Sequence, residues 1–183
     1  ILRCLVGSEM CIRDSYMLTR QLLPLMQPGC RIVNTVSCTY AIGRIEPDFF
    51  EKGRNGRFFR IPVYGNTKLA LLLFTQEFAE RLQDKDITIN ASDPGIVSTN
   101  MITMQAWFDP LTDILFRPFI KTPAQGAATA IHLALSDEAK DRNGCCYANC
   151  KKRNVSERIR HHAQQKQLWD DTEILLRQKG IRF

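Results

Sequence analysis

The feature that most constrains the fold is an alternation between short β-rich segments and longer segments of helical period. We expect strands at 30–36, 86–92 and 144–148, and helices at 16–26, 63–83, 123–136 and 163–179. The helix at 16–26 can carry six apolar side chains on one face and is expected to end at Pro28-Gly29; they are Tyr16, Leu18, Leu22, Leu23, Leu25 and Met26. Alternation of this kind predicts right-handed βαβ units and an α/β fold, a doubly wound parallel sheet with helices on both faces.

Other boundaries follow from the residues that begin or end an element. Thr122-Pro123 is a cap followed by a first-turn proline, and it predicts the start of a helix. Residues 38–62 contain three glycines and two prolines, and we interpret them as a long loop. Three parallel strands are few for the helices attached to them, so the sheet is expected to be incomplete on its N-terminal side.

The composition is that of one ordinary globular domain. The 183 residues are 44% hydrophobic and 24% charged, and the net charge is +6. Seven irregularly spaced cysteines do not form a disulfide framework, which favours a reducing compartment, cytoplasmic or beside a membrane. No apolar run reaches the roughly 18 residues of a transmembrane helix. A basic patch at 151–162 could meet nucleic acid or a membrane surface, but no nucleic-acid fold accompanies it, so a solvated surface is favoured.

The first fifteen residues differ from the remainder. Residues 4–15 resemble the conceptual translation of a sequencing adapter, and they carry no sustained period of two or 3.6. We therefore interpret residues 1–15 as a non-native leader and exclude them from the prediction of the fold.

Three segments carry candidate chemistry. Tyr64 and Lys68 lie four residues apart on a predicted helix, so both project from one face, where an ammonium favours the ionised form of a phenol. Ser37 follows the first predicted strand, and Pro94-Gly95 follows the second. Each of them alone fits a surface pair or a turn. Ligands of open α/β sheets bind beyond the carboxyl ends of the strands, so together they predict one site.

The motifs Val33-Asn34-x-x-Ser37, Tyr64-x-x-x-Lys68 and Pro94-Gly95-x-x-x-Thr99 resemble the short-chain dehydrogenase/reductase family. The segments Lys121-Thr-Pro-x-x-Gly126 and Tyr147-Ala-Asn-Cys150 are similar to its retinol dehydrogenase-like branch. The resemblance runs from about residue 16 to the C-terminus. It implies that residues 16–183 are the C-terminal part of a single Rossmann-like oxidoreductase domain, whose first βαβ units are missing.

The resemblance also implies roles and a cofactor. Tyr64 would be the general acid/base, Lys68 would favour its ionised form and bind the nicotinamide ribose, and Ser37 would hold the substrate oxygen. The cofactor is NADP or NAD, with NADP favoured, and a homodimer is left open. Residues of the strand-end segment would contact the cofactor beside Tyr64 and Lys68: Pro94, Gly95, Ile96 and Thr99.

The sequence also departs from the family pattern. It has no Gly-rich dinucleotide turn, no acidic or basic cofactor selector, and no asparagine near Cys11, where the family's catalytic asparagine is expected. Because the phosphate-binding turn supplies much of the cofactor affinity, we expect the 183-residue chain made alone to be inactive.

Residues 101–120 are unusually apolar, and the resemblance makes them a cap over the substrate. As a lid of Met101, Met104, Trp107 and Phe108 they fit a lipophilic small molecule such as a retinoid, a steroid or a fatty aldehyde. Packing on the core or on a membrane surface fits equally well.

The expected function is alcohol–carbonyl oxidoreduction; a non-catalytic nucleotide-sensing protein and a membrane-surface protein are the alternatives. The spacing at Cys145, Cys146 and Cys150 does not favour a metal site.

Overall fold

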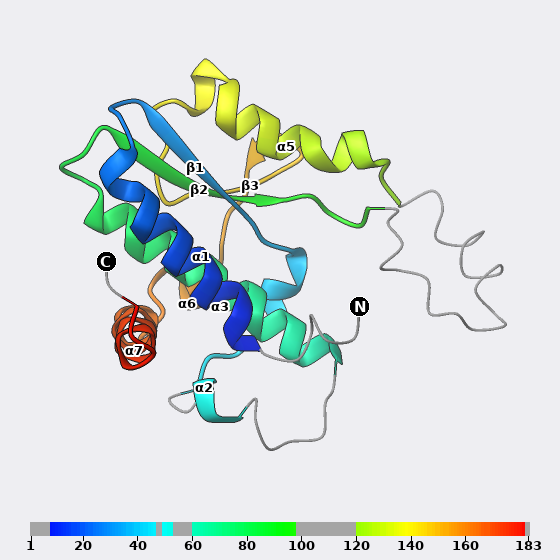
Figure 1. Ribbon diagram of the computed structural model, residues 1–183. Helices are drawn as coiled ribbons and strands as arrows, with labels where there is room; N and C mark the ends of the chain where they lie inside the picture. Colours follow the sequence, from blue (N-terminus) through cyan, green and yellow to red (C-terminus); the bar gives the residue numbers. More distant parts are fainter. Residues whose placement is uncertain (1–7, 47–48, 53–59, 98–119, 182–183) are drawn as a thin grey trace, which may run out of the picture.

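The computed structural model describes residues 8–46, 49–52, 60–97 and 120–181 (Figure 1). Its sheet has the order β1-β2-β3-β4, from β1 (Cys30–Thr35), β2 (Ile87–Asp93), β3 (Cys146–Ala148) and β4 (Lys151–Lys152). The first three strands are parallel, as predicted, and β4 runs antiparallel to β3. The two-residue strand β4 was not predicted, because the sequence shows it only as consecutive lysines.

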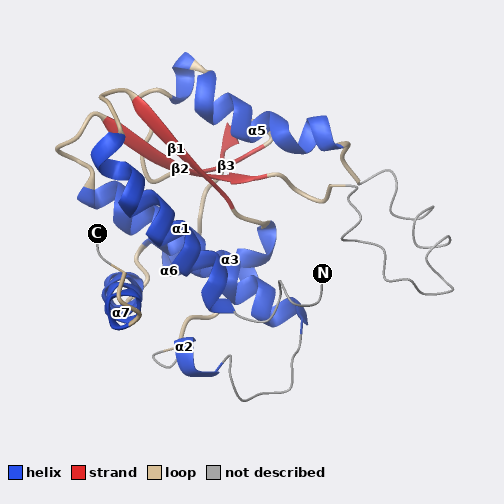
Figure 2. Ribbon diagram, in the orientation of Figure 1, coloured by secondary structure: helices blue, strands red, loops and turns tan. Residues whose placement is uncertain are grey.

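Helices cover both faces of the sheet. Figure 2 shows α5 (Pro123–Leu135) on one face, and α1 (Ser8–Leu22) and α3 (Arg60–Arg81) on the other. The helix α7 (Gln165–Gln178) packs against α1 and α3. Short elements complete the described chain: η2 (Leu23–Leu25), η3 (Cys38–Ile42), α2 (Phe49–Lys52), η5 (Asp137–Ala139) and α6 (Glu157–Arg160). The predicted α/β fold is confirmed.

The helix α1 differs from its prediction in both start and buried face. It begins at Ser8 rather than Tyr16, and its inward side chains are Ile12, Tyr16 and Thr19, at helical spacing. Leu18, assigned to the same face as Tyr16, is 59% exposed, and Leu22 and the η2 residue Leu25 are exposed as well. Hydrophobicity predicts the wrong face because the apolar side chains of Leu18 and Leu22 are exposed, whereas the polar side chain of Thr19 is buried. The non-native origin of residues 1–15 stays a prediction.

The core forms around α3, whose residues 69–75 are all buried. A helix that is apolar on all sides lies between two layers, and α3 contacts both the sheet and the pair α1 and α7. Aromatic rings join the three helices: Trp169 lies 4.6 Å from Tyr16 and 5.6 Å from Phe74, measured between ring centroids. This packing holds α3, and with it Tyr64 and Lys68, firmly against the sheet.

The segment at 38–62, predicted to be a loop, is partly helical. Its first five residues form η3, a short piece forms α2, and α3 begins at Arg60, with Pro62 in its first turn. The predicted start of α5 is confirmed, because the Thr122 side chain accepts from the Gln125 amide and the Gln125 side chain accepts from the Thr122 amide. In the part of the chain that the structure describes, no helix is long and apolar enough to cross a membrane.

Candidate active site

The carboxyl ends of β1 and β2 lie side by side, because the strands are parallel and paired in register from Cys30 with Ile87 to Thr35 with Ser92. The Val36 amide continues this pairing by donating to the Ser92 carbonyl. Ser37 and Pro94 therefore leave the sheet from neighbouring strands at one edge. In open α/β folds this edge is where ligands bind.

Tyr64 and Lys68 reach this edge from α3. Both are half-buried, one helical turn apart, and the Lys68 Nζ lies 5.5 Å from the centroid of the Tyr64 ring. The same Nζ donates a hydrogen bond of 2.9 Å to the Thr35 carbonyl, the last residue of β1. Lys68 thus joins the helix to the strand that leads into Ser37, and it places a cation beside the phenol.

Ser37 lies at the start of η3, where its Oγ accepts from the Thr39 amide at 3.5 Å. The short helix η3 packs closely against α3 at Gly65, the residue after Tyr64. A Cβ added to Gly65 would lie 2.9 Å from the Thr39 carbonyl oxygen, and a Cβ added to Gly43 would lie 2.5 Å from the Gly65 oxygen. Only glycine permits this approach, which brings the Ser37 turn beside the first half of α3.

Asn34, one of the two motif residues in β1, has a structural partner. The Asn34 side chain is buried and donates to the Thr75 Oγ1 at 2.9 Å, which ties β1 to the centre of α3. Asn34 therefore positions the strand that carries Ser37 and does not face the candidate site.

The segment after β2 turns sharply at Gly95, whose φ of +76° is a left-handed conformation that glycine adopts without strain. The carbonyl of Pro94 accepts from the Lys121 Nζ at 2.9 Å, and the Lys121 amide donates to the Ile96 carbonyl at 2.8 Å. Ile96 itself is 53% exposed. An exposed apolar side chain thus follows a fixed backbone turn, and the Lys68 ammonium of α3 is hydrogen-bonded to the end of the neighbouring strand β1.

Several predicted residues lie outside the described residues. They are Thr99 and the four lid residues Met101, Met104, Trp107 and Phe108. Lys121, which holds the Pro94 carbonyl, was missed as a site residue although its segment carried part of the family resemblance. Asp93, the last residue of β2, was not predicted as a site residue either; it is 1% exposed and forms an ion pair with Arg153.

Burial controls the titration of two groups near this edge. It raises the pKa of Tyr40 to about 12 and that of Cys146 to about 11, and the two side chains are hydrogen-bonded to each other. Cys146 is therefore a thiol at neutral pH and is not a thiolate nucleophile. Tyr40 likewise stays protonated at neutral pH.

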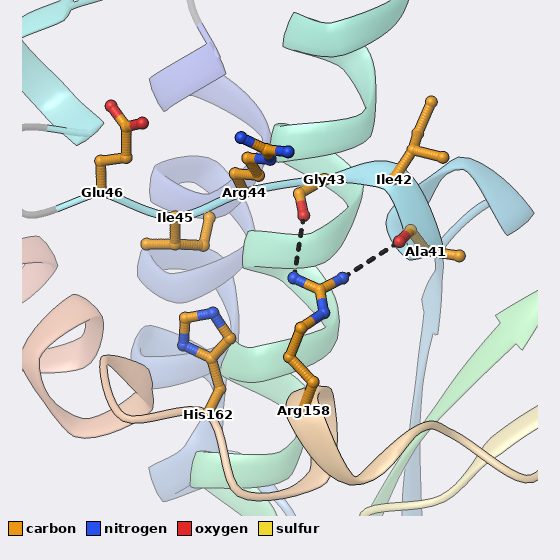
Figure 3. Close-up of a pocket in the computed structure, with 8 residues that line it drawn as sticks. All are labelled: Ala41, Ile42, Gly43, Arg44, Ile45, Glu46, Arg158 and His162. Atoms are coloured by element: carbon orange, nitrogen blue, oxygen red, sulfur yellow. Dashed lines mark hydrogen bonds between the residues drawn. The ribbon is translucent and has the colours of Figure 1, made fainter.

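A surface pocket of about 630 Å³ lies beyond η3, between residues 41–46 and the segment after β4 (Figure 3). Arg158 spans it and donates to the carbonyls of Ala41 and Gly43, at 3.0 and 3.4 Å. The neighbouring His162 has a lowered pKa because of burial and the nearby Arg158 charge. The pocket contains none of Ser37, Tyr64 and Lys68, and Arg158 serves to hold the backbone that follows Ser37.

Comparison with known proteins gives consistent matches. A family model described as short chain dehydrogenase matches residues 51–107. Retinol dehydrogenase 12 of Mus musculus is 36% identical over 170 residues, which are 92% of this chain and 52% of that protein. Retinol dehydrogenase 14 of Homo sapiens is 34% identical over 168 residues, with 88% and 49% covered. The chain thus spans about half the length of the curated relatives it matches.

Solved structures match in fold. A protein of Mycobacterium paratuberculosis aligns with a TM-score of 0.63 and 22% identity, over 87% of this chain and 54% of that one. A blue fluorescent protein from a metagenomic library, solved in complex with NADPH, aligns with a TM-score of 0.56 and 25% identity, over 76% and 51%.

Proposed function

The chain belongs to the short-chain dehydrogenase family, retinol dehydrogenase-like, and on that premise we propose that it carries the acid/base machinery of an NAD(P)-dependent oxidoreductase that interconverts an alcohol and a carbonyl. One observation carries the proposal. Lys68 lies against the Tyr64 ring and also hydrogen-bonds the end of the strand that leads into Ser37. Tyr64 and Lys68 come from α3, and Ser37 follows β1. The hydrogen bond from Lys68 to Thr35 joins these two elements.

Each side chain has one task. The Tyr64 hydroxyl gives a proton to the substrate oxygen in reduction and takes it back in oxidation. Lys68, with its Nζ near the ring, favours the ionised phenol in the oxidative direction. The Ser37 hydroxyl donates to the same substrate oxygen and stabilises the negative charge that develops on it.

The cofactor, when bound, supplies or accepts the hydride, and the protein sets its position. Lys68 would hold the ribose, while Pro94, Gly95, Ile96 and Thr99 would line the nicotinamide and adjoining phosphates. We favour NADP over NAD on the family resemblance. The NADPH found in one structurally similar protein supports this choice.

The substrate we propose is lipophilic, of retinoid, steroid or fatty aldehyde type. The names of the relatives, retinol dehydrogenases 12 and 14, support this class. The apolar sequence of residues 101–120 supports it as well, because apolar pockets bind apolar ligands through buried area.

The test replaces Tyr64 by phenylalanine in the intact protein, by which we mean a chain extended to the length of its relatives. It measures turnover of all-trans-retinol and all-trans-retinal with NADP(H). We expect the rate to fall by about 10²–10⁴-fold, because the proton donor is lost. Tyr147→Phe is the matched control: it removes the same hydroxyl from a buried tyrosine of β3. Equal rates for Tyr64→Phe and the unchanged protein would exclude the proposed role.

A further inference from the structure

A buried carboxylate lies directly before the Pro94-Gly95 turn. Asp93, the last residue of β2, is 1% exposed, and a buried charge is stable only when its oxygens are paired. Its Oδ1 accepts from the Gly95 amide at 3.0 Å. Its Oδ2 accepts from the Arg153 Nη1 at 2.8 Å. The shape of the turn therefore depends on a carboxylate whose charge is balanced by one arginine.

Arg153 also reaches the other side of the site. It follows β4, and its Cζ lies 5.9 Å from the centroid of the Tyr40 ring. Tyr40 is 3% exposed in η3, and its amide donates to the Ser37 carbonyl at 2.9 Å. The Arg153 amide donates to the Cys146 carbonyl, which fixes the arginine to β3. A continuous series of contacts thus runs from the Ser37 turn through Tyr40 and Arg153 to Asp93.

We propose that Arg153 is a positioning residue that holds the Ser37 turn and the Pro94-Gly95 turn in fixed relation to each other. It acts through Tyr40 on one side and through Asp93 on the other. A guanidinium combines a charge for the carboxylate with a flat face for the ring, which an ammonium does not. The consequence for catalysis rests on the proposed function, whereas the contact itself does not.

The test is site-resolved amide hydrogen exchange on the 183-residue chain, read at Gly95 and Tyr40. Arg153→Gln removes the charge and the flat cation together, so exchange is expected to quicken at both amides by about tenfold or more. Arg153→Lys keeps the charge, so protection is expected to return at Gly95 but not at Tyr40. Lys152→Gln is the control, with the same loss of charge at an exposed neighbouring residue.

The outcomes separate the alternatives. Exchange that quickens only within the β3–β4 hairpin, or at only one of the two amides in Arg153→Gln, would overturn the proposal. If Arg153→Gln does not fold, Arg153→Lys decides: equal protection at Gly95 and Tyr40, both as in the unchanged chain, would overturn it. The exchange result does not require cofactor binding.

A second measurement concerns the cofactor. Titration of the intact protein with NADPH, followed by its fluorescence, is expected to give a dissociation constant several-fold higher in Arg153→Gln and unchanged in Lys152→Gln. No binding by the unchanged protein would count against the proposed function, while the exchange data would still decide the role of Arg153.

Discussion

Replacement of Gly43 by alanine should destabilise the protein by crowding alone. The backbone of Gly43 has φ −66°, which alanine adopts freely. Without a steric conflict, the substitution would therefore stabilise the fold by about 0.4–1 kcal/mol, because it restricts the unfolded chain. The new Cβ, however, would lie 2.5 Å from the Gly65 oxygen and 2.8 Å from the Leu69 Cβ. Both neighbours belong to α3 and cannot rotate away.

Close packing and chain restriction therefore predict opposite signs for the change in the free energy of unfolding. Contacts below 3.0 Å force something to shift, and overpacking of this kind costs about 1–3 kcal/mol. We expect Gly43→Ala to lower the free energy of unfolding by that amount in urea titration at neutral pH. Because the Ser37 turn lies in the same segment, a displacement of η3 from α3 should also reduce turnover by the intact protein.

A second glycine provides the control. Gly29 has φ +85° and nothing within 4 Å of an added Cβ, so Gly29→Ala measures backbone strain without crowding, at about 1–2 kcal/mol. Its effect should be confined to stability. A Gly43→Ala variant that is neutral or more stable than the unchanged protein would refute the close packing of η3 on α3.

Further predictions follow from the same structure. Thr122→Ala removes the reciprocal cap of α5 and should cost about 1 kcal/mol in denaturant titration, whereas Thr122→Ser should retain most of it. Cys146 and Tyr40 have raised folded pKa values of about 11 and 12, so the unfolded chain loses their protons first. The free energy of unfolding should therefore fall as the pH rises above about 9, and Cys146→Ala should weaken this dependence; an unchanged slope would contradict it. The 183-residue chain made alone should show no turnover with NADP(H), because its sequence has no Gly-rich phosphate-binding turn; measurable turnover would show otherwise.

The fold could be predicted largely from local patterns. The parallel strands β1 and β2 and the helix α3 differ from their predicted bounds by three residues at most, because β-branched runs and helical periodicity are local signals. The face of α1 could not be predicted, since Thr19 is buried through a hydrogen bond to the Ser15 carbonyl while Leu18 is exposed. Hydrophobicity alone would place Leu18 in the core and Thr19 on the surface, which is the opposite of what the structure shows.

The candidate site was also predictable only in part. The positions of Ser37, Tyr64, Lys68 and Pro94-Gly95 in the fold could be predicted because each follows a predicted strand or lies on a predicted helix, while their roles stay a prediction. The contacts that hold them could not, because the partners are far apart in sequence and carry no shared local pattern. Asp93 and Arg153 are separated by 60 residues, and Lys121 and Pro94 by 27. Long-range pairing of this kind is visible only in the folded chain.

The central claim is that Ser37 and Tyr64 act on one substrate oxygen. A double-mutant cycle on kcat/KM for retinal reduction by the intact protein, with Ser37→Ala, Tyr64→Phe and their combination, tests it directly. If both hydroxyls serve the same oxygen, the double variant should lose little more activity than Tyr64→Phe alone, because groups that act as a unit are not additive. Losses that multiply independently would contradict the shared site.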